Sequence, residues 1–474
     1  MRHTLRAGVI RAGVLAGSAG LILSTAGGAA SGSEAAAGGD WPAYLNGPAH
    51  SSYSKGQTTI RPADVGRLVV KWRFRGDRPT KPGQPRTGYL ASPTVVDGDI
   101  YIGANTGWFY KLNAATGHAL AKRFIGFQRA KTCFPARGLV DTATVTADRS
   151  GQRMVYVGGA NGYLYALRAS DLSVKWRSVI ARPSRKVSNF FQWSSPTVAR
   201  GRIYIGISSN CDQPLVRAGL ISYSQSNGAR RATFRPLPRA MVGASIWSSA
   251  AVGPDHDVYV STGNAEKRTK EPGHSDSIVK LTPLKLRAIR SFKVPQSQVV
   301  GDGDFGASPV IFGPLVGACN KNGIFYALRR STMTVAWERR VGAPAPHHGI
   351  SNCSAGAVYD GRVVYVATPR HVINGKAFPG SVQALNPRTG ALIWQTGLPN
   401  GVIGTPTMDG GGVLAVGTYD FTKAPNAIYL LRASDGKILR RLNRGNQDFA
   451  QSVFADGLIV TANGDGLAAW GLRR

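Results

Sequence analysis

The sequence predicts an all-β fold, an eight-bladed β-propeller built from four-stranded antiparallel blades. A unit of roughly 50 residues made of short alternating runs recurs along the chain, and such periods are typical of propellers and solenoids. Each clear copy runs through Tyr-Ala-Leu or a close variant, then a short Thr-Gly or Ser-Asp turn, then Trp or Phe; such copies begin at Ser92, Thr144 and Ala307. No ten-residue stretch shows a convincing helical period.

The repeats number eight. Units begin near Ser92, Thr144, Ser194, Trp247, Ala307, Gly356, Gly404 and Ser452. The last unit stops at Trp470, too early for four strands, whereas residues 68–74 match the outermost strand of a blade. We expect this N-terminal strand to complete the last blade, since closure removes the exposed sheet edges that an open array would leave.

The N-terminus predicts export. Arg2, Arg6 and Arg11 precede a short apolar core at residues 21–23, which is typical of a secretory signal peptide over residues 1–30. Residues 31–40 read as a flexible junction and residues 41–474 as one propeller domain. The alternative is a membrane anchor, although the apolar core is short and rich in Gly and Ala. We expect a secreted, extracellular or cell-envelope protein with no membrane span in the mature chain.

Cysteine and charge content indicate the compartment in which the protein works and the partners that it could bind. Four cysteines suit two disulfides in an exported protein, with three pairings open: Cys133, Cys211, Cys319 and Cys353. No CxxCH motif occurs, so no covalent haem c is expected. The chain carries 58 Lys and Arg against 25 Asp and Glu, a formal charge of +33. This balance favours an anionic partner such as a cell-envelope polymer. Without a basic helix or an RNA-binding signature, no dedicated nucleic-acid partner is expected.

The long connections fall on one face of the predicted propeller. Turns between the first two strands and the last two strands of each blade are short, whereas loops between the middle strands expand in four blades. These loops cover residues 209–219, 261–277, 367–380 and 417–426, and all four cysteines lie in connections on the same face. Long loops on a rigid scaffold tend to carry function, so we expect the site there.

The chain resembles the quinoprotein alcohol dehydrogenase superfamily. The resemblance is carried by the Tyr-Ala-Leu to Trp repeat, by Asp40-Trp41-Pro42 and by the count of eight blades, and it covers nearly all of the mature chain. It implies pyrroloquinoline quinone (PQQ) and a divalent cation bound on the loop-rich face. Secreted proteins similar to polyvinyl-alcohol dehydrogenases are nearest in character. The superfamily also includes envelope-assembly scaffolds that hold no cofactor.

The resemblance implies roles for single residues. The stretch 233–265 is similar to the family segment that supplies a Trp beneath the quinone and an Asn cation ligand, here Trp247 and Asn264. Asp212 stands where the family has a Glu ligand, so the carboxylate is shorter. Asp304 best matches the catalytic aspartate, which also contacts the cation, and Asp302 lies close by.

Other residues would hold the cofactor. Lys321 stands where relatives place a cation near the quinone oxygens, and Arg137 matches an Arg that binds a PQQ carboxylate, which suits charge-assisted bonds. Ser194 and Ser209 are further expected cofactor contacts. Ca²⁺ prefers such carboxylate and amide oxygens, and a lanthanide is a second candidate because of the extra carboxylate at Asp302. The cation would polarise a quinone carbonyl while an aspartate takes the alcohol proton.

Each of these residues also has a structural interpretation. Asn264 could be a turn residue with left-handed backbone, Trp247 a core aromatic, and Asp302 and Asp304 caps of a Gly-rich turn. The sequence therefore predicts a secreted alcohol dehydrogenase, for a small or polymeric alcohol, that passes electrons to a separate acceptor. The alternatives are a non-catalytic extracellular binding or assembly scaffold, and a protein that recognises anionic envelope polymers.

Overall fold

The structure is a computed structural model that describes residues 39–129, 136–181, 190–266, 273–344, 353–419, 426–446 and 449–473. The chain divides into residues 1–34 and residues 35–474, and all described residues belong to the second unit. The predicted signal peptide, nearly all of the predicted junction and Cys133 lie outside the described residues. Export therefore stays a prediction.

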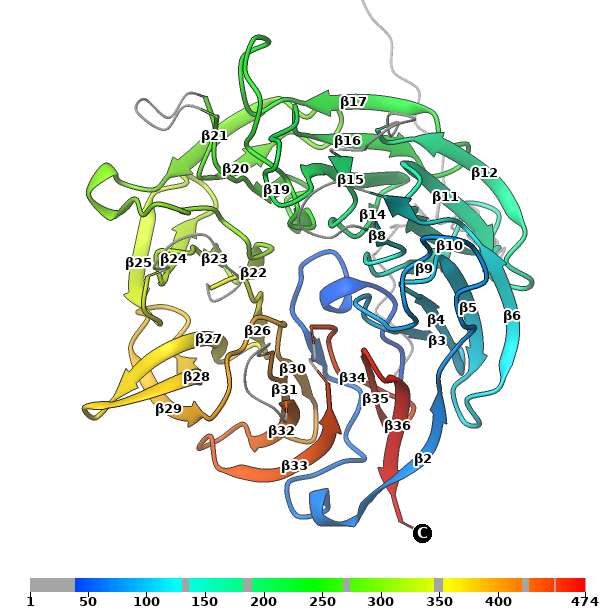
Figure 1. The fold of residues 1–474 in the computed structure, drawn as a ribbon. Helices are drawn as coiled ribbons and strands as arrows, with labels where there is room; N and C mark the ends of the chain where they lie inside the picture. The colour runs from blue at the N-terminus through cyan, green and yellow to red at the C-terminus, as the bar shows by residue number, and fades with distance from the viewer. Residues whose placement is uncertain are drawn as a thin grey trace, which may run out of the picture. The chain divides into compact units, whose positions relative to one another are not determined.

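The described residues form eight antiparallel sheets around a common axis, as the sequence predicts (Figure 1). In each blade the first strand is innermost. Blade 1 contains β3 (Thr94–Val96), β4 (Asp99–Gly103), β5 (Trp108–Asn113) and β6 (Ala119–Phe124). Blade 2 contains β9 (Thr144–Ala147), β10 (Arg153–Gly158), β11 (Tyr163–Arg168) and β12 (Val174–Val179). Blade 3 contains β14 (Thr197–Ala199), β15 (Arg202–Ser209), β16 (Gly219–Ser224) and β17 (Arg230–Phe234). Blade 4 contains β18 (Ala251–Val252), β19 (Val258–Ser261), β20 (Ser277–Leu281) and β21 (Ala288–Lys293).

The remaining four blades follow the same order. Blade 5 contains β22 (Val310–Phe312), β23 (Leu315–Cys319), β24 (Ile324–Arg329) and β25 (Val335–Arg340). Blade 6 contains β26 (Ala357–Tyr359), β27 (Val364–Ile373), β28 (Lys376–Leu385) and β29 (Leu392–Leu398). Blade 7 contains β30 (Thr407–Asp409), β31 (Val413–Gly417), β32 (Asn426–Arg432) and β33 (Ile438–Gly445). Blade 8 contains β34 (Val453–Ala455), β35 (Leu458–Asn463), β36 (Gly466–Leu472) and, outermost, β2 (Leu68–Phe74).

The ring closes where the sequence predicts. Strand β2 pairs antiparallel with β36, so the N-terminal strand completes the last blade and leaves the ring without a gap (Figure 1). Other short strands of the described residues are β1 (Tyr53–Ser54), β7 (Gln128–Arg129), β8 (Ala136–Arg137) and β13 (Phe190–Phe191). The helical elements among the described residues are three 3₁₀ turns, η1 (Tyr44–Asn46), η2 (Val65–Arg67) and η3 (Gln296–Gln298). None of the described helices has the length and apolar character needed to cross a bilayer.

The repeated Trp and Gly of the sequence join neighbouring blades. The Trp of an outer strand packs on the Gly in the turn between the third and fourth strands of the next blade, and a Cβ on that Gly would lie 2.4–2.5 Å from the indole. In three of the four pairs below the ring N–H also donates to a backbone carbonyl of the same turn, as Trp394 Nε1 does to Ala433 at 2.9 Å, whereas Trp176 Nε1 has no partner among the described residues. The Trp and Gly pairs are Trp72 with Gly117, Trp176 with Gly228, Trp337 with Gly390, and Trp394 with Gly436. The Trp and Gly positions of the sequence repeat therefore correspond to contacts between neighbouring blades.

A belt of hydrogen bonds links the blades nearer the axis. Just before an innermost strand, a backbone N–H of one blade donates to a hydroxyl at the same position of the next blade, at 2.9–3.1 Å. These bonds run from Gln451 to Ser92, Ser92 to Thr142, Thr142 to Ser195, Ser195 to Ser249, and Ser249 to Ser308. Buried polar groups are satisfied in this way, so the hydroxyls in the repeat have a structural role.

The N-terminal segment 41–54 runs along the innermost strands of the ring. Its backbone exchanges hydrogen bonds with six blades, through Trp41 with Val95, Pro42 with Val145, Pro48 with Val252, Ala49 with Ile311, Ser51 with Tyr359, and Ser52 with Met408. Trp41 is fully buried as a result. The segment brings Tyr44 to the axial cavity described below, which the repeat pattern does not predict.

One predicted loop is wrong. Residues 367–380 are not an irregular loop, because β27 and β28 extend through them as one long hairpin. Its turn is Asn374-Gly375, and both residues have positive φ, 49° and 79°. An Asn-Gly pair in this conformation closes a two-residue hairpin and matches the twist of the strands. The sequence signal for a strand hairpin was therefore present.

Candidate functional site

A cavity of about 650 Å³ opens among the long loops of the predicted face. Its lining comes from the connections between blades and from the loops between middle strands, so almost every blade contributes a side chain. The volume lies in the range of pockets that bind cofactors and small molecules. Six of the nine predicted site residues line it: Arg137, Asp212, Trp247, Asn264, Asp302 and Lys321.

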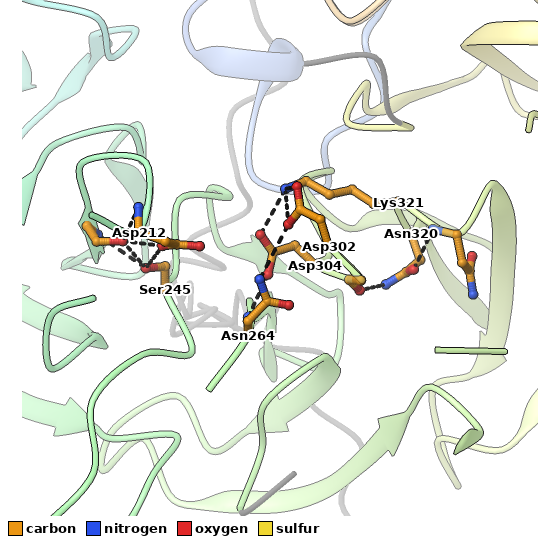
Figure 2. A network of polar contacts seen from close by, with 10 residues as sticks. Asp212, Ser245, Asn264, Asp302, Asp304, Asn320 and Lys321 are labelled. Atoms are coloured by element: carbon orange, nitrogen blue, oxygen red, sulfur yellow. Dashed lines mark hydrogen bonds and ion pairs between the residues drawn. The ribbon is translucent and has the colours of Figure 1, made fainter. Parts of the chain in front are cut away.

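Lys321 is the centre of the polar wall. It follows β23 in the loop before β24, and its ammonium lies between two carboxylates (Figure 2). Lys321 Nζ donates to Asp302 Oδ1 and Oδ2 at 3.0 and 3.1 Å and to Asp304 Oδ2 at 2.9 Å. The side chains are at most 10% exposed. Breaking such a buried pair leaves an uncompensated charge, so the three residues act as a unit.

The pKa values of this cluster favour the charged forms at neutral pH. Burial raises the pKa of Asp304 to about 6, against the attraction of Lys321 and with further repulsion from Asp212 and Asp302. Burial lowers the pKa of Lys321, but the two aspartates outweigh it and leave that pKa raised. The ammonium therefore stays protonated and compensates the two buried carboxylates.

Asp302 and Asp304 differ in their access to the cavity. Asp302 lines it, whereas the Asp304 side chain is fully buried and is not part of the lining. Asp304 Oδ1 instead accepts the backbone N–H of Asn264 at 2.6 Å. The sequence ranks Asp304 first as proton acceptor, whereas of the two aspartates only Asp302 lines the cavity. A spacing of two residues in a Gly-rich loop does not predict which side chain faces outward.

Asn264 is not a left-handed turn residue, because it is absent from the positive-φ residues of the described chain. It is 6% exposed and lines the cavity. The preceding Gly263 lets two side chains come close, since a Cβ there would lie 2.9 Å from Asp304 Oδ1 and 3.2 Å from Trp247 Nε1. The Thr-Gly-Asn sequence is thus fixed by packing around the polar cluster.

Asp212 lies across a gap from Asn264 and Asp304 in Figure 2. Ser209 and Ser245 hold it: the Ser209 hydroxyl donates to Asp212 Oδ1, and the two serine oxygens are 3.0 Å apart. Ser209 is buried and does not line the cavity. It therefore positions Asp212 in this structure and does not face the cavity as a cofactor contact would.

Trp247 partly faces the cavity and is not an enclosed core residue. Lys321 Nζ lies 4.7 Å from its ring centroid, a cation–π contact. Its ring N–H is buried and has no hydrogen-bond partner among the described residues. An exposed indole face next to a cation can receive a planar, electron-poor ring.

The remaining predicted residues lie farther round the ring. Arg137 lines the cavity, where burial lowers the pKa of its guanidinium and Tyr419 opposes the shift. Ser194 does not line it, because its hydroxyl accepts the backbone N–H of Gly206 at 3.0 Å inside blade 3. The neighbouring Ser195 is on the wall instead. The sequence thus locates the segment, and the serine that lines the cavity is one position after the predicted one.

Several wall residues were not predicted. Tyr44 comes from the N-terminal segment, Glu266 from the loop of blade 4, Tyr419 from the loop of blade 7 and Phe449 from the connection to blade 8. Tyr419 and Phe449 contact edge to face at 6.0 Å. The long loops at 261–277 and 417–426 pointed to Glu266 and to the vicinity of Tyr419. Nothing in the repeat pointed to Tyr44.

A disulfide braces the same face. Cys319 and Cys353 are bonded, with Cα atoms 5.6 Å apart. The bond joins the end of β23, two residues before Lys321, to the connection that leads into blade 6. Cys211 is also disulfide-bonded. One of the pairings left open by the sequence is therefore established, and disulfides lie on the loop-rich face as expected.

The residues present fit a polyanionic planar cofactor better than a metal ion alone. Arg137 and Lys321 supply cationic groups, Trp247 a ring face with an unsatisfied N–H, and the belt a row of hydroxyls. Among the described residues, no three His, Cys, Asp or Glu side chains are grouped to hold a metal. Asp212, Asn264 and Asp304 offer two carboxylates and an amide, so a Ca²⁺ ion would need additional oxygens from a bound molecule.

Sequence comparison identifies two families. Residues 41–172 match the family described as glucose/ethanol/alcohol dehydrogenase, beta-propeller domain. Residues 320–470 match the family described as outer membrane protein assembly factor BamB. None of the curated proteins matches the chain. The two family matches agree on the type of propeller and differ in what the named proteins do.

Solved structures support the fold over most of the chain. The quinohemoprotein alcohol dehydrogenase from Comamonas testosteroni is 17% identical with a TM-score of 0.72, and the match covers 92% of this chain and 81% of that one. A europium-containing methanol dehydrogenase is 13% identical with a TM-score of 0.68, covering 90% and 88%. BamB from Moraxella catarrhalis is 14% identical with a TM-score of 0.57, covering 85% and 100%. The chain thus has the propeller fold of these structures, and its residues 41–172 are similar to the propeller domain of glucose, ethanol and alcohol dehydrogenases.

Proposed function

We propose that the protein is an exported PQQ-dependent dehydrogenase that oxidises an alcohol. The observation that carries the proposal is the polar wall, where Lys321 joins two aspartates beside the exposed face of Trp247. A propeller that served only as a scaffold would have no need to bury this charge cluster against a cavity of about 650 Å³. Perturbed, buried charges in a cavity are typical of functional sites.

The cofactor would be held by residues from several blades. Arg137 would bind a carboxylate of PQQ and Trp247 would lie against its ring, while Asp212, Asn264 and Asp304 would contribute to a cation such as Ca²⁺. PQQ held there would supply a hydride acceptor for the alcohol, and a cation would supply Lewis-acid polarisation of a quinone carbonyl. The protein contributes orientation and charge.

Asp302 is the residue best placed to accept the proton of the substrate hydroxyl. It faces the cavity, and Lys321 donates to both of its oxygens, so the carboxylate is held in a fixed orientation. When Asp302 takes the proton, its ion pair with Lys321 is weakened. The ion pair between Lys321 and Asp304 remains. Asp304 is then a positioning residue that holds Lys321 and the backbone of Asn264.

Reconstitution tests this proposal. The purified protein is titrated with PQQ in the presence of Ca²⁺ or of La³⁺, and binding is followed by quenching of tryptophan fluorescence. Dye reduction is then measured with methanol, ethanol, benzyl alcohol and polyvinyl alcohol. We expect micromolar binding that weakens when Trp247 is replaced by Ala, and dye reduction that depends on Asp302. Absence of PQQ binding with either cation would overturn the proposal.

The second candidate is a non-catalytic extracellular scaffold. It is favoured by the match of residues 320–470 to an assembly factor and by the likeness of the fold to BamB. In that case the polar cluster would stabilise the fold only, and PQQ would not change the melting temperature. A rise in melting temperature with PQQ and Ca²⁺ would reject the scaffold, since a ligand that binds the folded state stabilises it.

A further inference from the structure

Positive charge is concentrated on the outermost strands of the propeller. In six of these eight strands there are two Lys or Arg residues, in β33 there are three, and in β29 there are none. Their single acidic residue is Glu338 in β25. The basic residues are Lys71, Arg73, Lys122, Arg123, Lys175, Arg177, Arg230, Arg231, Arg290, Lys293, Arg339, Arg340, Arg440, Arg441 and Arg444.

The innermost strands provide the contrast. None of the eight contains Lys or Arg, and their side chains are mostly buried. The excess of positive charge is therefore not spread evenly through the fold. It follows the rim that runs through β33, β2, β6, β12, β17, β21 and β25 in Figure 1. We call this set of seven strands the basic rim.

Part of this charge has no ion-pair partner among the residues that the structure describes. Lys122 pairs with Asp77 and Lys175 with Asp148, both on the rim. By contrast, Arg73, Arg231 and Arg290 are exposed and make no ion pair with any described residue. Clustered, unpaired charge raises the local potential and costs stability through self-repulsion. A bound polyanion would relieve that repulsion.

We propose that the basic rim binds a flexible linear polyanion that follows the outside of the propeller. Four strands about 4.8 Å apart place the rim only about 20–30 Å from the axis, so a partner must bend sharply to touch several blades. A stiff duplex with a persistence length of about 500 Å cannot do so. A flat globular surface would meet only one or two blades at a time. A flexible chain of repeated anionic groups can contact successive blades and gain from each of them.

The shared chemistry of the partner is a repeated anionic group, which can be a carboxylate or a phosphate. Release of counterions from such a polymer drives binding, so affinity should fall steeply with salt. The break at β29, the outermost strand of blade 6, which contains no Lys or Arg, makes the rim an open track with two ends. This inference does not depend on PQQ binding or on catalysis, because none of its residues lines the cavity.

The test uses the full-length protein and two fluorescent probes, poly-glutamate and polyphosphate. Binding is measured by anisotropy between roughly 50 and 200 mM NaCl. The rim variant combines Arg73→Glu, Arg231→Glu and Arg290→Glu. The matched control combines Arg149→Glu, Arg200→Glu and Arg362→Glu, which are exposed residues in turns between the first and second strands. Both variants change the formal charge equally, and thermal melting checks that both are folded.

We expect the rim variant to weaken binding of the preferred polymer about tenfold and the control to weaken it less than about threefold. The probe that binds more tightly identifies the anionic group. Equal weakening by the two variants would overturn the proposal, because it would show an effect of net charge alone. So would the failure of both probes to bind at low salt. Equally tight binding of a DNA duplex of about 30 base pairs would also overturn it, since such a duplex cannot follow the rim.

Discussion

The wall of the cavity has two contrasting halves. Blades 3 to 5 and their connections supply every acidic side chain of the described lining, together with Lys321. The rest of the ring supplies Arg137, uncharged polar side chains and a set of apolar or aromatic ones: Leu90, Val140, Ile403, Tyr419 and Phe449. The strands beneath both halves are the same, so the difference lies in the connections. The strands of the scaffold therefore repeat, whereas the acidic side chains of the wall come from three neighbouring blades only.

Two buried carboxyl groups, one in each half of the ring, differ in pKa. Asp141, in the connection between blades 1 and 2, is buried without a cationic partner, and burial raises its pKa to about 8. Asp304 is buried as completely, but Lys321 limits the rise of its pKa to about 6. The first is neutral at pH 7 and the second is ionised. The ammonium group of Lys321 therefore accounts for the difference in pKa between these two buried carboxyl groups.

The largest expected effect comes from the polar half. We expect Asp302→Asn to lower kcat for alcohol oxidation by about 10²- to 10⁴-fold, because the proton acceptor is lost. PQQ binding, measured by fluorescence, should change little. Asp304→Asn should act through Lys321, with a smaller loss of kcat and a shifted acid limb of the pH profile. If Asp304→Asn abolishes activity and Asp302→Asn does not, the assignment of the two aspartates is reversed.

Removal of the disulfide between Cys319 and Cys353 should destabilise the half of the wall that contains Lys321. We expect Cys319→Ser with Cys353→Ser to reduce the free energy of unfolding by about 3–4 kcal/mol, since the bond closes a loop with a sequence separation of 34. For a domain of this size, the melting temperature should fall by about 4 °C. PQQ affinity should fall as well, because Cys319 lies two residues before Lys321. An unchanged affinity would show that the loop holds Lys321 without the disulfide.

The buried carboxyl group of Asp141 should make the stability of the protein depend on pH. The pKa of Asp141 is higher in the folded than in the unfolded protein, so the folded state holds the proton more tightly and stability falls as pH rises from about 4 to about 8. Asp141→Asn lacks this fall, and we expect it to be more stable than the wild type by on the order of 2 kcal/mol near pH 8, with no gain near pH 4. Denaturant unfolding at both pH values measures the difference.

Asp148 serves as the control with the opposite sign. Its hydrogen bond to Lys175 lowers the pKa of Asp148 to about 2. Stability from this contact is present at neutral pH and is lost as pH falls through that pKa. Asp148→Asn should therefore destabilise the protein at neutral pH and have little effect near pH 2. A gain in stability at neutral pH would contradict the proposed linkage.

The smallest effect is expected from the two aromatic side chains in the half of the wall that has no acidic residue. Tyr419→Ala and Phe449→Ala should each raise KM for benzyl alcohol about three- to tenfold, since an edge-to-face contact is worth about 0.5–1.5 kcal/mol. The KM for methanol should stay the same, because methanol is too small to reach both rings and the polar wall. Equal changes for the two alcohols would show that these side chains support the cofactor or the loops.

Much of the fold was predictable from local patterns. The eight units and the pairing of residues 68–74 with the last blade are confirmed, and the helical elements of the described residues are three short 3₁₀ turns. The units could be predicted because similar short strands and turns recur in every blade, and the Trp–Gly contact joins four pairs of neighbouring blades. The extended hairpin at Asn374-Gly375 was missed although its turn sequence favours it, because the length of the segment suggested a loop. The path of residues 41–54 along the inner strands was not predictable, because it depends on contacts with six blades at once.

The sequence by itself determined the ring, its closing strand and the face on which the long loops gather. Only the tertiary structure decided that Asp302 faces the cavity while Asp304 lies behind Lys321, and that Ser195 is on the wall while Ser194 is not. The physical reason is that a repeat specifies backbone hydrogen bonds and packing at regular intervals. Which of two neighbouring side chains in a connection points toward the axis is set by contacts with other blades, far away in the sequence.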